Sequence, residues 1–472
     1  MPLILPGNVA SATAGAYSIA NSCRFNSTSS SVMSFTTGTP TSGTNWTVSL
    51  WIKRGLVTDA GQVLWGCHTD TSNRVNIKFD NGDIEVFESA GTLNLLTNAK
   101  YRDPGAWMNV VLATDTTQGT DTNRMKLYVN GTQVTSFSAT QYPAEDDVLE
   151  PAKASKVHRV GAKDDSYWDG YVAEVAFIDG QQLAATSFGQ FNEDSPTIWE
   201  PKDISGLTFG NNGYWLDFED SSALGNDVSG ENNDFTPANL DATDSSTDTP
   251  TNNFCVMNPL DNEYADATFS EGNCKVVTNA SNKTWNTATV GLTAGKWYWE
   301  IYNVTSPSDY ILNGIAEGPT VSSSAQLGAQ TYNYAHNADN GTIYNAATGY
   351  AYGVVTAVDE ILGVYLDLDN NKLYFAKDGV IMNSGTGHSI SAVTSTANGV
   401  YFPAVGEYST STYTAAVNFG GSPAFTVSSG NEDANGYGNF EFSPNDGGGS
   451  SFDSAAKDFL AICTKNLGSD GG

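Results

Sequence analysis

The chain has 472 residues, enough for two or three domains with their own cores, and a formal net charge of −31. This surplus of 52 Asp and Glu over 21 Lys and Arg would repel a phosphate backbone, which argues against DNA or RNA as a partner. The same excess suits either a soluble particle surface in salty water or a protein that binds divalent cations. The 47 Gly residues and 11% aromatic residues are typical of short strands joined by tight turns, so an all-β protein is expected.

Residues 1–22 are expected to form an N-terminal arm. Their apolar run covers only Leu3 to Leu5, Pro6-Gly7 ends it, and the first basic residue is Arg24. A secretory signal needs a basic start and a longer apolar stretch, so none is predicted here. No window reaches the length of a membrane span, and membrane insertion is not expected.

The first predicted domain, residues 23–200, contains five motifs that follow one another along the chain. They are WTVSLWIKRG (46–55), DPGAWMNVVLATDT (103–116), NRMKLYVNG (123–131), RVGA (159–162) and WDGYVAEVAFIDGQQL (168–183). In this order they resemble a laminin-G or concanavalin-A-like jelly roll. The resemblance implies an antiparallel β-sandwich.

Residues 201–261 are rich in Asn, Asp, Ser and Gly, which favours Asx turns and ordered loops. Within them, Gly213 to Phe218 has the composition of a strand. We therefore predict an Asn/Asp-rich connecting segment that docks on the first sandwich.

The second predicted domain, residues 262–425, contains a complete β-hairpin at Glu360 to Val380. Leu362, Val364, Leu366 and Leu368 alternate with the residues between them, as in a strand with one buried face. Asp369 to Asn371 supply turn residues, and Asp378-Gly379 forms a second turn. Together with GKWYWEIYN (295–303), NGIAEG (313–318), YFPAVGEYS (401–409) and AAVNFGG (415–421), this hairpin resembles a SPRY domain, a recognition β-sandwich.

The C-terminal segment, residues 426–472, contains the motif DFLAICTKNL (458–467). The connecting tract, the second domain and this motif are together similar to virion proteins of marine tailed bacteriophages. This resemblance implies a non-enzymatic structural protein of a fibre, tail or capsid appendage on the virion surface, with adhesion to a host glycan or receptor as its function. A purely structural role in assembly or decoration, with other virion proteins as partners, and a glycan-degrading depolymerase are the alternatives. Phage appendages are commonly homotrimers, and a homotrimer is an expectation from the resemblance alone.

A depolymerase on a jelly roll would need two carboxylates that flank the scissile bond. The nearest candidates are Asp83, Glu85 and Glu88. Asp83 and Glu85 share a strand face, whereas Glu88 points to the other, so no catalytic residues are predicted.

Several laminin-G-like domains bind calcium at the rim of the sandwich, and the resemblance extends this expectation to Asp164, Asp165 and Asp169. A second acidic cluster contains Asp220, Asp227 and Asp234, and neither cluster matches the EF-hand spacing. A hydrogen-bonded turn is the alternative interpretation.

Aromatic and amide side chains in loops are the candidates for ligand binding, because sugars stack on rings and bond to planar polar groups. The densest group lies in a predicted insertion of the second domain and comprises Tyr332, Tyr334, His336, Tyr344, Tyr350 and Tyr352. The first domain offers a predicted loop with Trp65, His68, Asp70 and Arg74. Packing of these rings against strands or neighbouring subunits is the alternative in both cases.

The five cysteines are widely separated, with no CxxC pair, so structural thiols are expected rather than disulfides or a zinc site. They are Cys23, Cys67, Cys255, Cys274 and Cys463.

Overall fold

The computed structural model describes residues 17–57, 61–70, 73–88, 91, 93–281, 283–305, 310–408, 411–445 and 457–470. It divides into two compact units, with the boundary between Thr251 and Asn252. Most of the predicted N-terminal arm, residues 1–16, including Leu3 to Leu5, lies outside the described residues. No helix in the described part of the chain has the length and hydropathy needed to cross a membrane.

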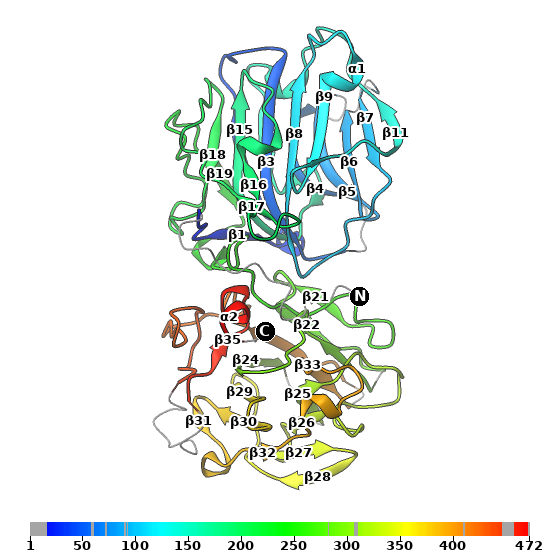
Figure 1. Ribbon diagram of the computed structural model, residues 1–472, viewed down its shortest axis with the longest axis vertical. Helices are drawn as coiled ribbons and strands as arrows, with labels where there is room; N and C mark the ends of the chain where they lie inside the picture. The colour runs from blue at the N-terminus through cyan, green and yellow to red at the C-terminus, as the bar shows by residue number, and fades with distance from the viewer. Residues whose placement is uncertain are drawn as a thin grey trace. The chain divides into compact units, whose positions relative to one another are not determined.

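The first unit is a sandwich of two eight-stranded sheets, counted over the described residues (Figure 1). One sheet has the order β10 (Thr132–Gln133), β9 (Met125–Val129), β8 (Trp107–Asp115), β3 (Asn45–Arg54), β15 (Gly170–Asp179), β1 (Ser22–Phe25) and β20 (Ser245–Ser246), with β18 (Tyr214–Leu216) also paired to β15. The other has the order β11 (Phe137–Gln141), β7 (Asn94–Thr97), β6 (Asp83–Glu88), β5 (Asn73–Asp80), β4 (Gln62–Asp70), β12 (Val157–Val160), β2 (Val32–Thr36) and β19 (Thr236–Ala238). Two small hairpins, β13 (Ala162–Lys163) with β14 (Ser166–Tyr167) and β16 (Gly189–Phe191) with β17 (Trp199–Pro201), complete the unit.

The core between these sheets is aromatic. The rings of Trp46, Trp65 and Phe177 lie with centroids about 6 Å apart, and Tyr214 stacks on Phe177 at 5.5 Å. The Trp65 indole N–H also donates to the Tyr214 hydroxyl over 2.7 Å. Tyr214 comes from the predicted connecting segment, so this segment is part of the first core.

The outer face of the β3–β15 sheet is covered as well. Trp51, Ala173 and Ile178 on this face pack against Phe188 and Trp199 from the chain that follows β15. Because both faces are covered, β15 is buried along its whole length and its sequence is apolar almost throughout.

The connecting segment pairs with the first sandwich through three short strands: β18 with β15, β19 with β2, and β20 with β1. The predicted strand at Gly213 to Phe218 is β18. Residues 201–251 belong to the first unit and residues 252–261 to the second, so the boundary falls inside the predicted segment.

The second unit is also a sandwich, with sheets of nine and six strands among the described residues (Figure 1). The larger sheet has the order β21 (Thr268–Ser270), β22 (Lys275–Val277), β34 (Thr414–Asn418), β24 (Lys296–Thr305), β29 (Ile361–Asp367), β30 (Lys372–Lys377) and β31 (Val380–Ile381), with β32 (His388–Ser389) on β30 and β35 (Leu460–Ala461) on β24. The smaller sheet has the order β23 (Trp285–Thr287), β33 (Phe402–Glu407), β25 (Ile311–Ala316), β26 (Tyr334–Asn337), β27 (Thr342–Asn345) and β28 (Thr348–Ala351).

The predicted hairpin is present. β29 and β30 pair from Leu362↔Lys377 to Asp367↔Lys372. Asp378 and Gly379 form the second turn with φ values of 46° and 76°, the left-handed pair that a two-residue hairpin turn requires. The prediction of a hairpin from alternation and turn residues is confirmed.

The expectation of a single buried face in β29 is wrong. Tyr365 is fully buried on the opposite face, where it packs against Tyr298 and Phe459. Phe459 precedes β35, so the C-terminal segment forms a third layer on this sheet.

The two short helices of the described chain are α1 (Asp121–Arg124) and α2 (Thr464–Asp470). All five cysteines are free and buried, which confirms the prediction of structural thiols.

Candidate ligand-binding sites

The tyrosine-rich stretch of the second unit is not a loop, contrary to the prediction. It forms β26, β27 and β28, which extend the smaller sheet. Tyr334 and His336 are two residues apart on β26 and both are buried in the core, with 3% and 1% of their surface exposed. Tyr352 is also buried, and its ring meets Phe375 edge-on. These three side chains are packing residues.

The remaining rings of this stretch lie nearer the surface. Tyr350 is 44% exposed, and its ring lies 5.3 Å from that of the half-buried His388. Tyr332 and Tyr344 are half-buried. The sequence prediction therefore holds for part of the set at most.

A cavity of about 450 Å³ lies beside this stretch, and we call it the Glu317 pocket. Its lining combines apolar side chains with a carboxylate and two amides. The residues are Glu317, Gly318, Pro319, Val321, Gln330, Asn398, Val400 and Phe402. This volume falls within the range of small-molecule sites in proteins.

Hydrogen bonds hold the walls of the Glu317 pocket in place. The Glu317 carboxylate accepts a bond from the Ala397 N–H over 2.8 Å, and its backbone carbonyl accepts one from the Asn398 amide over 2.8 Å. Its backbone N–H donates to the amide oxygen of Asn333, whose amide nitrogen in turn donates to Gln330. The pocket is thus formed before any ligand arrives.

The lining of this pocket suits a ligand with one apolar face and a polar edge. Val321, with 64% of its surface exposed, and the largely buried Phe402 offer apolar contact. Glu317, Gln330 and Asn398 offer planar hydrogen-bonding groups. None of these residues stands out in the sequence. The motifs NGIAEG and YFPAVGEYS are far apart along the chain, and they become neighbours only when β25 pairs with β33.

The predicted loop site of the first unit is a β-hairpin of β4 and β5. Trp65 is fully buried in the core, so its assignment to a ligand site is wrong. Asp70 accepts hydrogen bonds from Asn73 across the hairpin end. His68 and Arg74 reach toward Asp164, with His68 Nε2 to Asp164 Oδ1 at 3.5 Å and Arg74 Nη1 to Asp164 Oδ2 at 3.6 Å.

The calcium prediction is not supported by the surroundings of its three carboxylates. Asp164 lies among the basic groups of Arg74, Lys163 and His68. Asp169 is buried and accepts bonds from the backbone N–H and hydroxyl of Ser27, whereas Asp165 is exposed. No group of three or more His, Cys, Asp or Glu side chains in the described residues is placed to hold a metal ion.

The carboxylates considered for catalysis are dispersed on β6. Asp83 pairs with Lys100 at 2.5 Å and Glu85 with Lys78 at 2.6 Å. Glu88 lies on the opposite face, next to the core residues of this strand, and burial raises its pKa.

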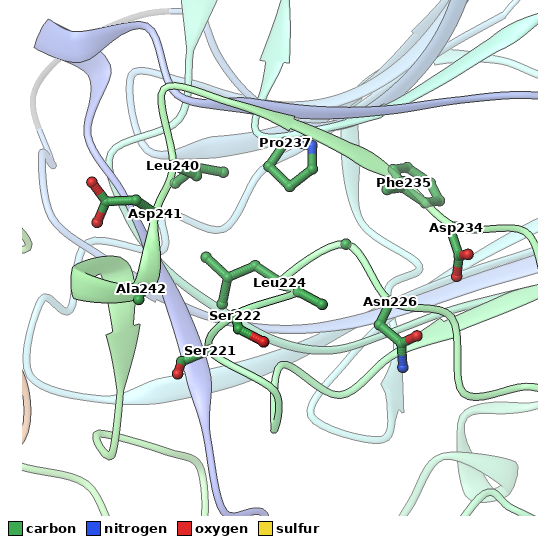
Figure 2. A pocket seen from close by; sticks show the side chains of 12 residues that line it. Ser221, Ser222, Leu224, Asn226, Asp234, Phe235, Pro237, Leu240, Asp241 and Ala242 are labelled. Carbon is green, nitrogen blue, oxygen red and sulfur yellow. The ribbon is translucent and has the colours of Figure 1, made fainter.

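A second cavity, of about 510 Å³, lies in the connecting segment between the loop 221–226 and β19 with the chain after it (Figure 2). We call it the Leu224 pocket. Of the acidic cluster identified in the sequence, Asp234 lines it, and the buried Asp227 lies behind it as a hydrogen-bonding centre. Sequence reasoning missed the pocket because its two walls meet only in the folded chain.

Comparisons with known proteins agree with this architecture. Residues 26–185 match the concanavalin A-like lectin/glucanases superfamily, and residues 296–422 match the SPRY domain. The chain thus contains both domains, in the order expected, and the all-β fold is confirmed. No curated protein matches it.

Three solved structures illustrate the likeness. A native heptameric SAP-like pentraxin from Limulus polyphemus is 16% identical over 36% of this chain and 80% of its own, with a TM-score of 0.28. The SPRY domain of human HERC1 is 16% identical over 34% of this chain and 96% of its own, with a TM-score of 0.27. Domain 4 of the extracellular arabinanase AbnA from Geobacillus stearothermophilus, solved with arabinotriose, is 21% identical over 29% of this chain and 62% of its own, with a TM-score of 0.24. Both domain types in this chain are compatible with carbohydrate or receptor binding.

Proposed function

We propose that the chain is a non-enzymatic bacteriophage virion protein, displayed on the particle surface, that adheres to a host-surface glycan or receptor through the Glu317 pocket. The binding role rests on the lining of this pocket, where apolar contact at Val321 and Phe402 lies beside the polar groups of Glu317 and Asn398. A sugar ring or a short extended segment of a receptor presents the same combination of an apolar face and a polar edge. The virion setting is supported by the resemblance of the second half of the sequence to phage virion proteins.

A non-enzymatic role is supported by the positions of the carboxylates on β6. A glycan-cleaving enzyme needs an acid and a second carboxylate on either side of one bond. Glu85 is paired with Lys78 on one face of the strand, and Glu88 lies on the other.

Retention on bacterial cells tests this proposal. Purified full-length protein is incubated with a panel of intact marine bacteria and with polysaccharide extracted from each. We expect saturable retention on at least one strain. The variant Val321→Asp should lose this retention, because a bound ligand would have to remove water from the added carboxylate at the mouth of the pocket, which costs free energy. Val321 is 64% exposed, so the folded state should tolerate the substitution.

The matched control is Val148→Asp, which makes the same change at a valine that is 38% exposed in the first unit. This variant should be retained like the unmodified protein. Equal retention of both variants on a binding strain would remove the Glu317 pocket from the proposal, and no retention on any strain would remove the adhesion role.

One observation favours the second candidate function, a contact within the virion. Four valines of the second unit are exposed: Val354, Val355 and Val358 in one short stretch of chain, and Val380 on β31. Lys377, which pairs with Glu360 at 2.8 Å, connects the two places. Lys377 donates to the Val355 carbonyl and pairs in register with Val380. Exposed apolar groups gathered in this way are typical of protein contacts.

The variant Val380→Asp tests this second role. If the valines join copies of the chain, as in the expected homotrimer, Val380→Asp should lower the mass measured by sedimentation, whereas Val321→Asp should leave it unchanged. A monomeric unmodified protein would exclude self-association through the valines.

A further inference from the structure

The Leu224 pocket has an apolar floor and a polar rim. Leu224 lies on one side of the pocket and Pro237 and Leu240 on the other, as Figure 2 shows, and together they form this apolar floor, with the buried Phe235 at one end. Asp234 lies at the same end of the pocket and Asp241 at the opposite end. Ser221, Ser222 and Asn226 complete the polar rim.

The walls of this pocket are fixed by hydrogen bonds. The buried Asp227 accepts bonds from the backbone N–H groups of Trp215, Ser229 and Asn233, at 2.8 to 2.9 Å. Its own N–H donates to Asp234 Oδ1 over 2.9 Å. The Phe235 N–H donates to the Gly225 carbonyl across the pocket base. At the opposite end of the pocket, Asp241 caps the short 3-10 helix at residues 242–244. A ligand would therefore meet a shape that already exists.

The polar lining accepts hydrogen bonds more than it donates them. The carboxylates of Asp234 and Asp241 only accept, and Pro237 has no backbone N–H to offer. No Lys, Arg or His is among the residues that line the pocket. The lining carries a charge of −2 from two aspartates, inside a chain of −31, so it disfavours anions and suits donor-rich cations.

The position of β19 in its sheet indicates how a ligand would lie in the pocket. Over the described residues β19 is the last strand of its sheet, paired with β2, and its Pro237 lines the pocket. An extended segment laid along this edge would place alternate side chains on the floor. A sugar is favoured less, because no Trp or Tyr is among the residues that line the pocket, and two carboxylates favour a cationic ligand over a neutral one.

We propose that the Leu224 pocket binds an extended basic segment of a partner protein, with an apolar side chain on Leu224, Pro237 and Leu240 and Lys or Arg on either side paired with Asp234 and Asp241. Long basic side chains suit the site because their aliphatic stems cover apolar surface while their charged ends reach the rim. This inference concerns the first unit and a protein ligand, so it is independent of the proposed role of the Glu317 pocket.

A random peptide library tests the inference. Labelled full-length protein is incubated with beads that carry heptapeptides, and the peptides on the brightest beads are sequenced. We expect Lys or Arg on both sides of an apolar residue to be enriched over the starting pool. The consensus peptide, synthesised with blocked ends, should bind more weakly as salt is raised, because its charges are solvent-exposed.

The double variant Asp234→Asn with Asp241→Asn should weaken binding of this consensus peptide by about tenfold, the loss expected for two exposed ion pairs. Asn keeps the oxygen that accepts from Asp227 and remains a good helix cap, so the walls of the pocket should persist. The control, Glu219→Gln with Glu231→Gln, removes the same charge from the same unit outside the pocket and should bind within about twofold of the unmodified protein.

Two results would overturn the inference. One is a library without basic enrichment, or a consensus peptide that the aspartate variant and the control bind equally. The other is binding of the unmodified protein to neutral oligosaccharides on an array, with this binding lost in the aspartate variant. That result would assign the pocket to sugars. The variant Val321→Asp, in the other unit, should leave peptide binding unchanged whatever its effect on adhesion.

Discussion

Glu300, in the middle of β24, accepts a hydrogen bond of 2.7 Å from the backbone N–H of Phe442, which lies 142 residues further along the chain. The same carboxylate accepts bonds from the Glu441 N–H, the Asn418 amide and the Tyr298 hydroxyl. It has no exposed surface. One buried side chain thus holds the start of the C-terminal layer against the larger sheet of the second unit.

The stability of this layer should depend on pH. Burial, which outweighs the hydrogen bonds, raises the pKa of Glu300 from 4.5 to about 7. Because the folded state favours the protonated acid, its contribution is complete below about pH 4.5 and is lost as pH rises through 7, on the order of 3 kcal/mol in total. Hydrogen exchange of residues 439–442, corrected for intrinsic rates, should show less protection at pH 8 than at pH 5.

The variant Glu300→Gln should remove this pH dependence, since glutamine does not titrate. It should also lower protection at all pH values, because its amide nitrogen cannot accept the bonds that the second carboxylate oxygen accepts. Glu263→Gln, at an exposed position in the same unit, is the control and should keep the dependence. An unchanged pH profile in Glu300→Gln would show that another group titrates.

Two tyrosines from the predicted ligand set should differ strongly in how much truncation destabilises the second unit. Tyr334 is 3% exposed and Tyr350 is 44% exposed. Tyr334→Ala should lower the free energy of unfolding of the second unit by about 3 to 5 kcal/mol, because it leaves a cavity in the core. Tyr350→Ala should change it by less than about 0.5 kcal/mol. Urea denaturation followed by tryptophan fluorescence measures both, and a similar loss in the two variants would contradict the assignment of Tyr334 to the core.

The sequence predicts local structure well wherever the signal is local. The pairing of β29 with β30 follows from alternation and turn residues within twenty positions, and the motifs around Trp46 and Trp168 indicate the first sandwich. The same alternation suggests one buried face for β29, yet Tyr365 is buried too, because the layer that covers it comes from residues near Phe459. Such long-range cover leaves no periodic signal in the strand itself.

The candidate sites could be predicted less well, for the same reason. The sequence predicts separate ligand and metal sites for His68, Arg74 and Asp164, whereas the folded chain brings them together, with Arg74 paired to Asp164 and His68 Nε2 at 3.5 Å from the same carboxylate. The register of β4 with β5 and the position of the β13–β14 hairpin decide this, and neither is encoded in residue spacing. Both pockets likewise join residues from separate loops.

The Asn-Gly turn of the first unit should be intolerant of a side chain at its glycine. Gly131 has a φ of 74°, and a Cβ there would overlap the ring of Trp199. Gly131→Ala should therefore combine backbone strain with overpacking and destabilise the first unit by about 2 to 5 kcal/mol. Gly91 also has a φ of 74° but has nothing within 4 Å of such a Cβ, so Gly91→Ala should cost only the strain, about 1 to 2 kcal/mol. Chemical denaturation of the two variants gives the comparison, and equal losses would mean that Trp199 moves aside freely.

Calcium should leave the stability of the first unit unchanged. A calcium site needs several oxygen ligands with surplus negative charge, whereas Asp164 is already compensated by Arg74 and Lys163. Thermal unfolding of the full-length protein in millimolar calcium and in a chelator should give the same midpoint, because a ligand that does not bind the folded state cannot raise it. A midpoint several degrees higher in calcium, with the increase abolished by Asp164→Asn, would restore the metal site at this hairpin. Were the increase to survive in Asp164→Asn, calcium would bind elsewhere in the chain, and the ion pairs at Asp164 would keep their structural role.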